Sequence, residues 1–216
     1  ALLLLCGACR GGPDVAVVAS IDLGPLETHA SIRARDGGYS GLFQGRSVWL
    51  YGDSILGLAG EDGSSWRDNS WSWTEDDDAS DGITGFSEPL DALDAPHEFF
   101  PETNDEHEFN VAHAGEDCEQ EPCGARQVLW PGPLVEDAER DRALVFYSKI
   151  HGEPGPWNFR SMGCSVAIWE DWDAGPTRPE VFPDGDEATL LWSEDDAFCA
   201  SAALIEDGWL WAWSCV

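Results

Sequence analysis

The stretch that decides the fold is Ser40-Gly-Leu-Phe-Gln-Gly-Arg-Ser-Val-Trp-Leu-Tyr-Gly-Asp-Ser54. Two short apolar runs flank a Gln-Gly-Arg turn, which is the pattern of a β-hairpin. The same plan recurs in residues 132–148 with a longer turn, and in residues 201–214 around Glu-Asp-Gly. Further strands are predicted at residues 164–170 and 189–192. No long helical period follows the first residues, so the pattern predicts an all-β fold.

Repeated hairpins separated by whole extra strands favour a β-propeller, whose blades bury their faces against one another. The alternative is a β-sandwich, which needs shorter and more even connections. One connection, residues 57–126, is a long acidic insertion that is rich in Trp and His and poor in strand signals. Insertions of this kind are often functional loops.

Charge limits the classes of partner. The chain has 216 residues, of which 42 are acidic and 11 basic, and its formal net charge is −31. Such a surface repels phosphate backbones, so nucleic acid is excluded as a partner. It also repels anionic lipid headgroups, so membrane attachment requires a lipid anchor or an apolar segment.

The N-terminus, Leu2-Leu-Leu-Leu-Cys-Gly-Ala-Cys9, is an apolar run followed by small residues. It is too short to cross a bilayer and is typical of the end of a secretory signal. It resembles a bacterial lipoprotein signal, in which Cys9 would be lipidated. The alternative is an ordinary cleaved signal peptide. Both interpretations predict export, as a bacterial membrane-anchored lipoprotein or an extracellular protein. We therefore expect a signal end at residues 1–9, a linker at 10–30 and a truncated domain at 31–216.

Export permits disulfides. Cys118 and Cys123 are predicted to close a small loop. Zinc is the competing interpretation, but the spacing lacks a second matched pair. The pairing among Cys164, Cys199 and Cys215 stays open, because three cysteines leave one over.

The segment Arg35-Asp-Gly-Gly-Tyr-Ser, continuing to Gly52-Asp-Ser54, resembles the first blade of a bacterial family of exported five-bladed propellers. Many members are known only as a domain of unknown function. Some relatives are glycoside hydrolases that cut arabinose-containing polysaccharides with paired carboxylates in the central funnel. The resemblance implies about three of five blades here, and a polysaccharide or cell-surface glycan as partner. The alternative function is a non-catalytic surface lipoprotein that binds a glycan or another partner, because fold does not fix function.

Asp36 and Asp53 are the candidate catalytic pair. Glycoside hydrolysis needs two carboxyl groups flanking the scissile bond. Asp36 precedes two glycines and Asp53 ends an aromatic strand, so a hairpin can bring them to one mouth. The resemblance points to the same two residues. The alternative is that both aspartates only cap turns.

Four residues are candidates for substrate binding. Arg35 is placed to bond a carboxylate or sugar hydroxyls, or to form a structural ion pair. Tyr39 is either a stacking platform or a strand residue. Trp71 and Trp73 lie in the insertion, where exposed indoles would stack on sugar rings or pin the loop as a small cluster.

No cofactor is required by this chemistry. The run from Asp77 through Asp81-Gly82 to Glu88 nearly matches a calcium loop, but Ala79 stands where an oxygen ligand belongs. Calcium is therefore a minor hypothesis. His97, His107 and His113 have no recognised zinc spacing, so no metal site is predicted.

Overall fold

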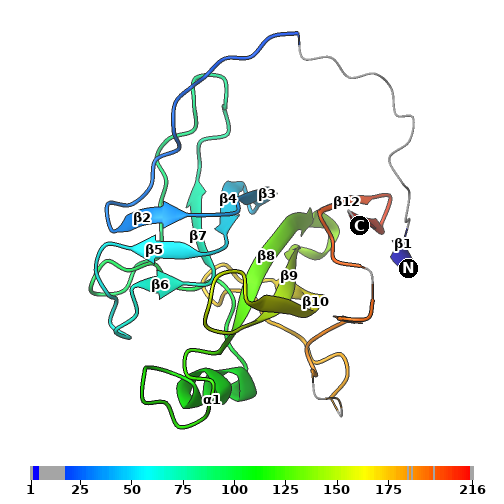
Figure 1. The fold of residues 1–216 in the computed structure, drawn as a ribbon. Helices are drawn as coiled ribbons and strands as arrows, with labels where there is room; N and C mark the ends of the chain where they lie inside the picture. Colours follow the sequence, from blue (N-terminus) through cyan, green and yellow to red (C-terminus); the bar gives the residue numbers. More distant parts are fainter. Residues whose placement is uncertain (1, 5–17, 184, 186, 197, 215–216) are drawn as a thin grey trace.

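A computed structural model describes residues 2–4, 18–183, 185, 187–196 and 198–214. Within this part of the chain the fold is all-β, with one short α-helix. The strands form four small sheets, ordered β1-β13-β12, β11-β10-β9-β8, β2-β5-β6 and β3-β4-β7 (Figure 1). Every pairing is antiparallel except that between β1 (Leu2–Leu4) and β13. The prediction of an all-β fold is confirmed.

The deciding stretch forms the β3 (Tyr39–Phe43) and β4 (Arg46–Tyr51) hairpin. Its two turn residues, Gln44 and Gly45, have φ values of 48° and 75°. Positive φ at both positions gives a turn whose twist matches the flanking strands. The β12 (Ala202–Glu206) and β13 (Trp209–Trp213) hairpin uses the same device at Asp207 and Gly208.

The central sheet contains the longest strands, β8 (Arg126–Asp137), β9 (Arg142–Gly152) and β10 (Phe159–Trp169). A short 3-10 turn at Ala138–Arg140 joins β8 to β9, and β11 (Trp192–Ser193) completes the sheet. β3 lies so close to β8 that a Cβ at Gly41 would come within 2.7 Å of Leu134.

The insertion is more regular than the sequence predicted. Its first strand, β6 (Trp66–Arg67), pairs with β5 (Ser54–Leu56), which pairs with β2 (Ile32–Arg35); β2 and β5 both precede the insertion. β7 (Ser70–Thr74) joins β4, and α1 (Asn104–Ala112) follows. Thr103 and Glu106 form a capping box at the start of the helix. The insertion was described as poor in strand signals; β6 and β7 nevertheless form in it, each against a strand that precedes the insertion.

The main core lies between the β3-β4-β7 sheet and the central sheet. Trp71 and Trp73, on β7, pack against it in an aromatic cluster with Trp169 and Trp172. Trp71 and Trp169 meet edge to face with ring centroids 5.3 Å apart. Such pairs stabilise a fold beyond the area that they bury. A smaller cluster around Phe146 and Trp192 lies beside β13.

Two disulfides are present among the described residues. Cys118 and Cys123 close their small loop, and Cys164 on β10 bonds to Cys199. Cys9, the predicted lipidation site, and Cys215 lie outside the described residues. Within the described part, no helix has the length and apolar character needed to cross a bilayer.

Candidate functional site

Asp36 and Asp53 occupy neighbouring positions on one antiparallel ladder. Arg35 at the end of β2 pairs with Ser54 at the start of β5. The ladder continues one step further, where the Asp36 N–H donates to the Asp53 carbonyl at 2.9 Å and the Gly52 N–H donates to the Asp36 carbonyl at 3.0 Å. A Cβ at Gly52 would lie 2.5 Å from Asp36 Oδ1, so a larger residue here would displace that carboxylate.

Both aspartates line one cavity of about 580 Å³, which we call the Asp53 cavity. Its walls come from the β2–β5 ladder, the beginning of β8, and the loop that joins β9 to β10. A volume of this size is within the usual range for small-molecule sites. The fold thus brings together the two carboxylates that the sequence selected.

The environment of Asp53 favours its protonated form. Partial burial, followed by the negative charge of Asp36, raises the pKa of Asp53 to about 6. The charge of Arg126 and the Trp130 indole N–H oppose this rise. The indole N–H is turned toward the carboxyl group without completing a hydrogen bond. Asp53 Oδ1 and Trp130 Nε1 are both buried and lack partners among the described residues.

Aromatic side chains surround these carboxylates. The Arg126 guanidinium lies 3.3 Å from the centroid of the Trp66 ring, a cation–π contact. On the other side, Trp130 meets Phe159 edge to face at 5.2 Å, and Trp157 stands beyond Phe159. All four aromatic residues line the Asp53 cavity. Flat aromatic faces beside a carboxyl pair are suited to a ring with apolar C–H faces and hydroxyl edges.

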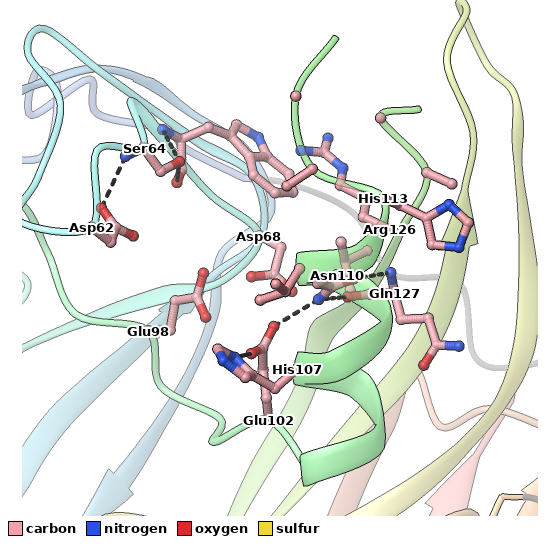
Figure 2. Close-up of a pocket in the computed structure, with 17 residues that line it drawn as sticks. Asp62, Ser64, Asp68, Glu98, Glu102, His107, Asn110, His113, Arg126 and Gln127 are labelled. Atoms are coloured by element: carbon pink, nitrogen blue, oxygen red, sulfur yellow. Dashed lines mark hydrogen bonds and ion pairs between the residues drawn. The ribbon is translucent and has the colours of Figure 1, made fainter. Parts of the chain in front are cut away.

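A second cavity of about 500 Å³ adjoins the first and shares Trp66 and Arg126 with it. We call it the Glu98 cavity. Figure 2 shows its acidic side chains, Asp68, Glu98 and Glu102, gathered opposite α1. Glu102 accepts hydrogen bonds from Asn110 at 2.7 Å and pairs with His107 at 2.9 Å, which ties it to the helix.

Asp68 and Glu98 form a carboxyl pair in this cavity. Asp68 is buried and accepts a hydrogen bond from the Leu129 N–H at 2.6 Å. Surrounding protein desolvates Glu98, although part of its side chain reaches solvent, and Asp68 adds a like charge. Together these effects raise the pKa of Glu98 and favour its protonated form beside Asp68.

The other predicted binding residues lie outside the two cavities. Arg35 pairs with Glu88 at 2.8 Å and covers the Tyr51 ring, so its contacts are those of the structural ion pair. Tyr39 packs against the main core from β3. Trp71 and Trp73 are half-buried strand residues, not loop platforms. Of the two alternatives for these indoles, packing in an aromatic cluster matches the structure, although they lie on a strand and not in a loop: β7 pairs with β4 and turns them onto Trp172.

Two sets of contacts bear on the calcium and zinc hypotheses. Glu88, the last ligand of the near-calcium loop, is engaged by Arg35 and is 4% exposed. Cys118, Glu121 and Cys123 place ligand atoms close together, but the two thiols are joined in a disulfide. A thiolate must be free to bind zinc, so this cluster does not offer a zinc site.

Sequence reasoning missed several residues of the cavities, above all Arg126, Trp130 and Glu98. Trp157 and Phe159 were also missed. The one available signal was the Gly-Glu-Pro-Gly-Pro-Trp run that ends at Trp157, a rigid turn carrying an aromatic residue. Glu98 and Asp68 have no signal that separates them from the 42 acidic residues of the chain.

Comparison with known proteins places no family on this chain. No known protein family matches the sequence, and no curated protein matches it. One solved structure that aligns with it is described as a "putative hydrolase" from Bacteroides ovatus, with 12% identity and a TM-score of 0.38. The alignment covers 76% of this chain and 40% of that one, so the chain spans well under half the length of this neighbour.

Proposed function

We propose that this chain carries a carbohydrate-active site of the glycoside hydrolase type, with Asp53 as general acid and Asp36 as its partner carboxylate. The observation that carries the proposal is the position of both carboxylates in one aromatic-walled cavity, where the pKa of Asp53 rises to about 6. Glycosidases use a pair of carboxyl groups of which one must hold a proton to give to the leaving oxygen.

The division of roles follows from the surroundings of each group. Asp53 is half-buried, and the cost of burying its charge keeps a proton on it into the mildly acidic range. Asp36 is exposed and its charge contributes to that shift. Asp36 is therefore the group that activates water or attacks the anomeric carbon. Arg126, which stacks on Trp66, acts on Asp53 through its charge and limits the rise of the pKa of Asp53.

The propeller architecture and export belong to the same proposal. The sheets of three or four strands are compatible with the blades of a partial propeller. Two disulfides are compatible with an oxidising compartment, and lipidation of Cys9 would hold the domain at a bacterial membrane surface.

The test is release of reducing ends from arabinan and related neutral glycans by the chain and two variants, Asp53→Asn and Asp36→Asn. Each substitution is expected to lower kcat/KM at least about a hundredfold, because it removes an acid or base function. Asp173→Asn, an exposed acid on the turn after β10, is the matched control and is expected to retain full activity. Wild-type rates in both cavity variants would refute the assignment. Glycan binding without any turnover by the parent chain would replace hydrolysis with a binding function.

A further inference from the structure

We propose that Trp157 and Phe159 form a second sugar-ring subsite at the rim of the Asp53 cavity, and that the ligand is a neutral oligosaccharide of at least two units. This inference rests on the proposed function, and it assigns a substrate class to the same cavity. One ring would lie between Asp36 and Asp53, and the next would stack on Trp157. We call the pair Trp157 and Phe159 the aromatic rim.

Trp157 has no structural role that explains its position. Its side chain is 88% exposed, the largest exposure of any tryptophan among the described residues. Its ring centroid lies 6.4 Å from that of Phe159, a loose contact, and Phe159 is itself 47% exposed. Two neighbouring aromatic rings left open to water at the edge of a cavity mark a binding surface.

The backbone holds Trp157 in an unfavourable conformation. Its φ is 60°, in the left-handed region that bulky residues avoid. Strain of this kind persists where surrounding structure imposes it, and it is concentrated at ligand-binding positions. A glycine would relieve the strain at no cost in packing, so the presence of an indole here indicates that the side chain is used.

The loop that carries Trp157 is rigid. The Glu153 N–H donates to the Asn158 carbonyl at 2.8 Å, and the Asn158 side chain donates to the Pro154 carbonyl at 3.2 Å. Pro154 and Pro156 fix two further φ angles. A platform that is already ordered loses little conformational entropy when a ligand stacks on it.

The aromatic rim is continuous with the carboxylates. Phe159 contacts Trp130, and Trp130 turns its indole N–H toward Asp53. All of these residues line the same cavity. A ligand bound at Asp53 can therefore extend along the cavity wall onto the rim, which is the arrangement needed to hold the neighbouring unit of a chain.

The charges of the cavity select neutral sugars. Asp36, Asp53 and Glu153 are acidic, and Arg126 is the one basic residue among those that line the cavity. The whole chain carries a net charge of −31. Uronic acids and sulfated sugars would be repelled both at long range and inside the site.

The test measures binding by the full chain carrying Asp53→Asn, so that no ligand is consumed, with Trp157→Ala, Trp157→Phe or Trp209→Ala added. Trp209 is an exposed tryptophan on β13 and serves as the matched control. The probes are neutral arabino-, xylo- and cello-oligosaccharides of one to six units, with oligogalacturonides as the anionic series. Binding is followed by calorimetry and by the change in tryptophan fluorescence.

We expect binding of at least one neutral series to strengthen about tenfold from one unit to two or three, which is the magnitude of one stacking contact. Trp157→Ala is expected to erase this gain, Trp157→Phe to keep most of it, and Trp209→Ala to change nothing. The melting temperature of Trp157→Ala should stay within about 2 °C of its parent, because the side chain is exposed.

The possible failures are distinguishable. If Trp157→Ala binds every probe as its parent does, the subsite is refuted and the catalytic proposal is unaffected. If the gain in affinity with oligosaccharide length requires Trp157 but the wild-type chain hydrolyses nothing, the subsite is supported and the catalytic proposal is refuted. Preference for the oligogalacturonides would refute the neutral substrate class, and absence of binding to all series would refute both proposals.

Discussion

Glu106 and Asp53 are both desolvated, but their pKa values shift in opposite directions. Glu106, on α1, is 2% exposed and receives hydrogen bonds from Arg178 at 2.6 and 2.7 Å, with Lys149 at 3.2 Å. Burial alone would raise its pKa, but the bonds and charge of Arg178 prevail and lower it to about 2. Asp53 is also desolvated, and the nearby acid Asp36 outweighs the cation Arg126, so its pKa rises to about 6.

The difference separates a structural acid from a functional one. A buried carboxylate that is fully paired holds elements together, and Glu106 joins α1 to the segment before β11 and to β9. A carboxyl group that is kept protonated beside a second acid, in a cavity, stabilises nothing by its charge. Perturbed groups of the second kind are concentrated at functional sites.

Removing the charge of Glu106 should have the largest effect. Glu106→Gln leaves Arg178 and Lys149 buried beside a neutral amide, and we expect a loss of about 3–5 kcal/mol in the free energy of unfolding. Urea denaturation at pH 7 measures it. Glu108→Gln, an exposed acid on the same helix, is the control and should change stability by less than about 0.5 kcal/mol. Equal effects in both variants would contradict the structural role.

The same contrast has a pH signature. The pKa of Glu106 is about 2 in the folded chain, below its ordinary value of 4.5, so its contribution is present above pH 4.5 and is lost as the pH falls toward 2. Wild-type stability should therefore decline over this window more steeply than that of Glu106→Gln.

Asp53→Asn should stabilise the chain while it abolishes the proposed activity. Since the folded pKa is about 6 and the ordinary value is 3.8, ionised Asp53 disfavours folding above pH 6 and has no effect below 3.8. Because the group is only half-buried, we expect a gain of about 1 kcal/mol at pH 8 and none at pH 3.5. Denaturation at the two pH values checks this. A destabilised variant at pH 8 would make Asp53 a structural acid like Glu106.

Arg126→Met should shift the alkaline limb of the pH–activity profile. The general acid must be protonated, so kcat/KM should fall as the pH rises through about 6. Loss of the Arg126 charge raises the pKa of Asp53, and the limb should shift upward by about half a unit. Arg160→Met, which breaks an exposed pair with Glu194, is the control and should leave the pH profile in place. A downward shift would exclude Arg126 as the cation beside Asp53.

Glu98→Gln should have the smallest effect. If Glu98 donates a shared proton to Asp68, a glutamine N–H can replace that donor, and stability at pH 7 should change by less than about 1 kcal/mol. Glu98→Ala removes the donor from a buried carboxylate and should cost more, about 1–3 kcal/mol. Equal costs for the two variants in denaturation experiments would show that no such proton is shared.

The local signals of the sequence predicted much of the sheet structure. Turn residues with positive φ, such as Gly45 and Gly208, mark the β3–β4 and β12–β13 hairpins directly. The helix α1 was missed although Thr103 and Glu106 carry the capping signature, because its faces show no apolar period. β7 was missed because acidic and amide residues around Trp71 suggested a loop.

The residues of the candidate site were likewise predicted only in part. Asp36 and Asp53 were found because the chain between them returns on itself, so their proximity is a local property of the ladder. The aromatic partners were misassigned because the exposure of an indole depends on distant residues. Trp71 is covered by Trp169, almost a hundred positions away, whereas Trp157 is covered by almost nothing.

Gly52 helps to make the backbone spacing of Asp36 and Asp53 independent of loop motion. Its missing side chain lets the Asp36 carboxylate fold back over the strand, and two backbone hydrogen bonds tie Asp36 to its neighbours across the ladder. The backbone spacing of Asp36 and Asp53 is therefore set by the geometry of this hydrogen-bonded ladder. Whatever the surrounding loops do as a ligand enters or leaves, the backbone at the two acids keeps its spacing.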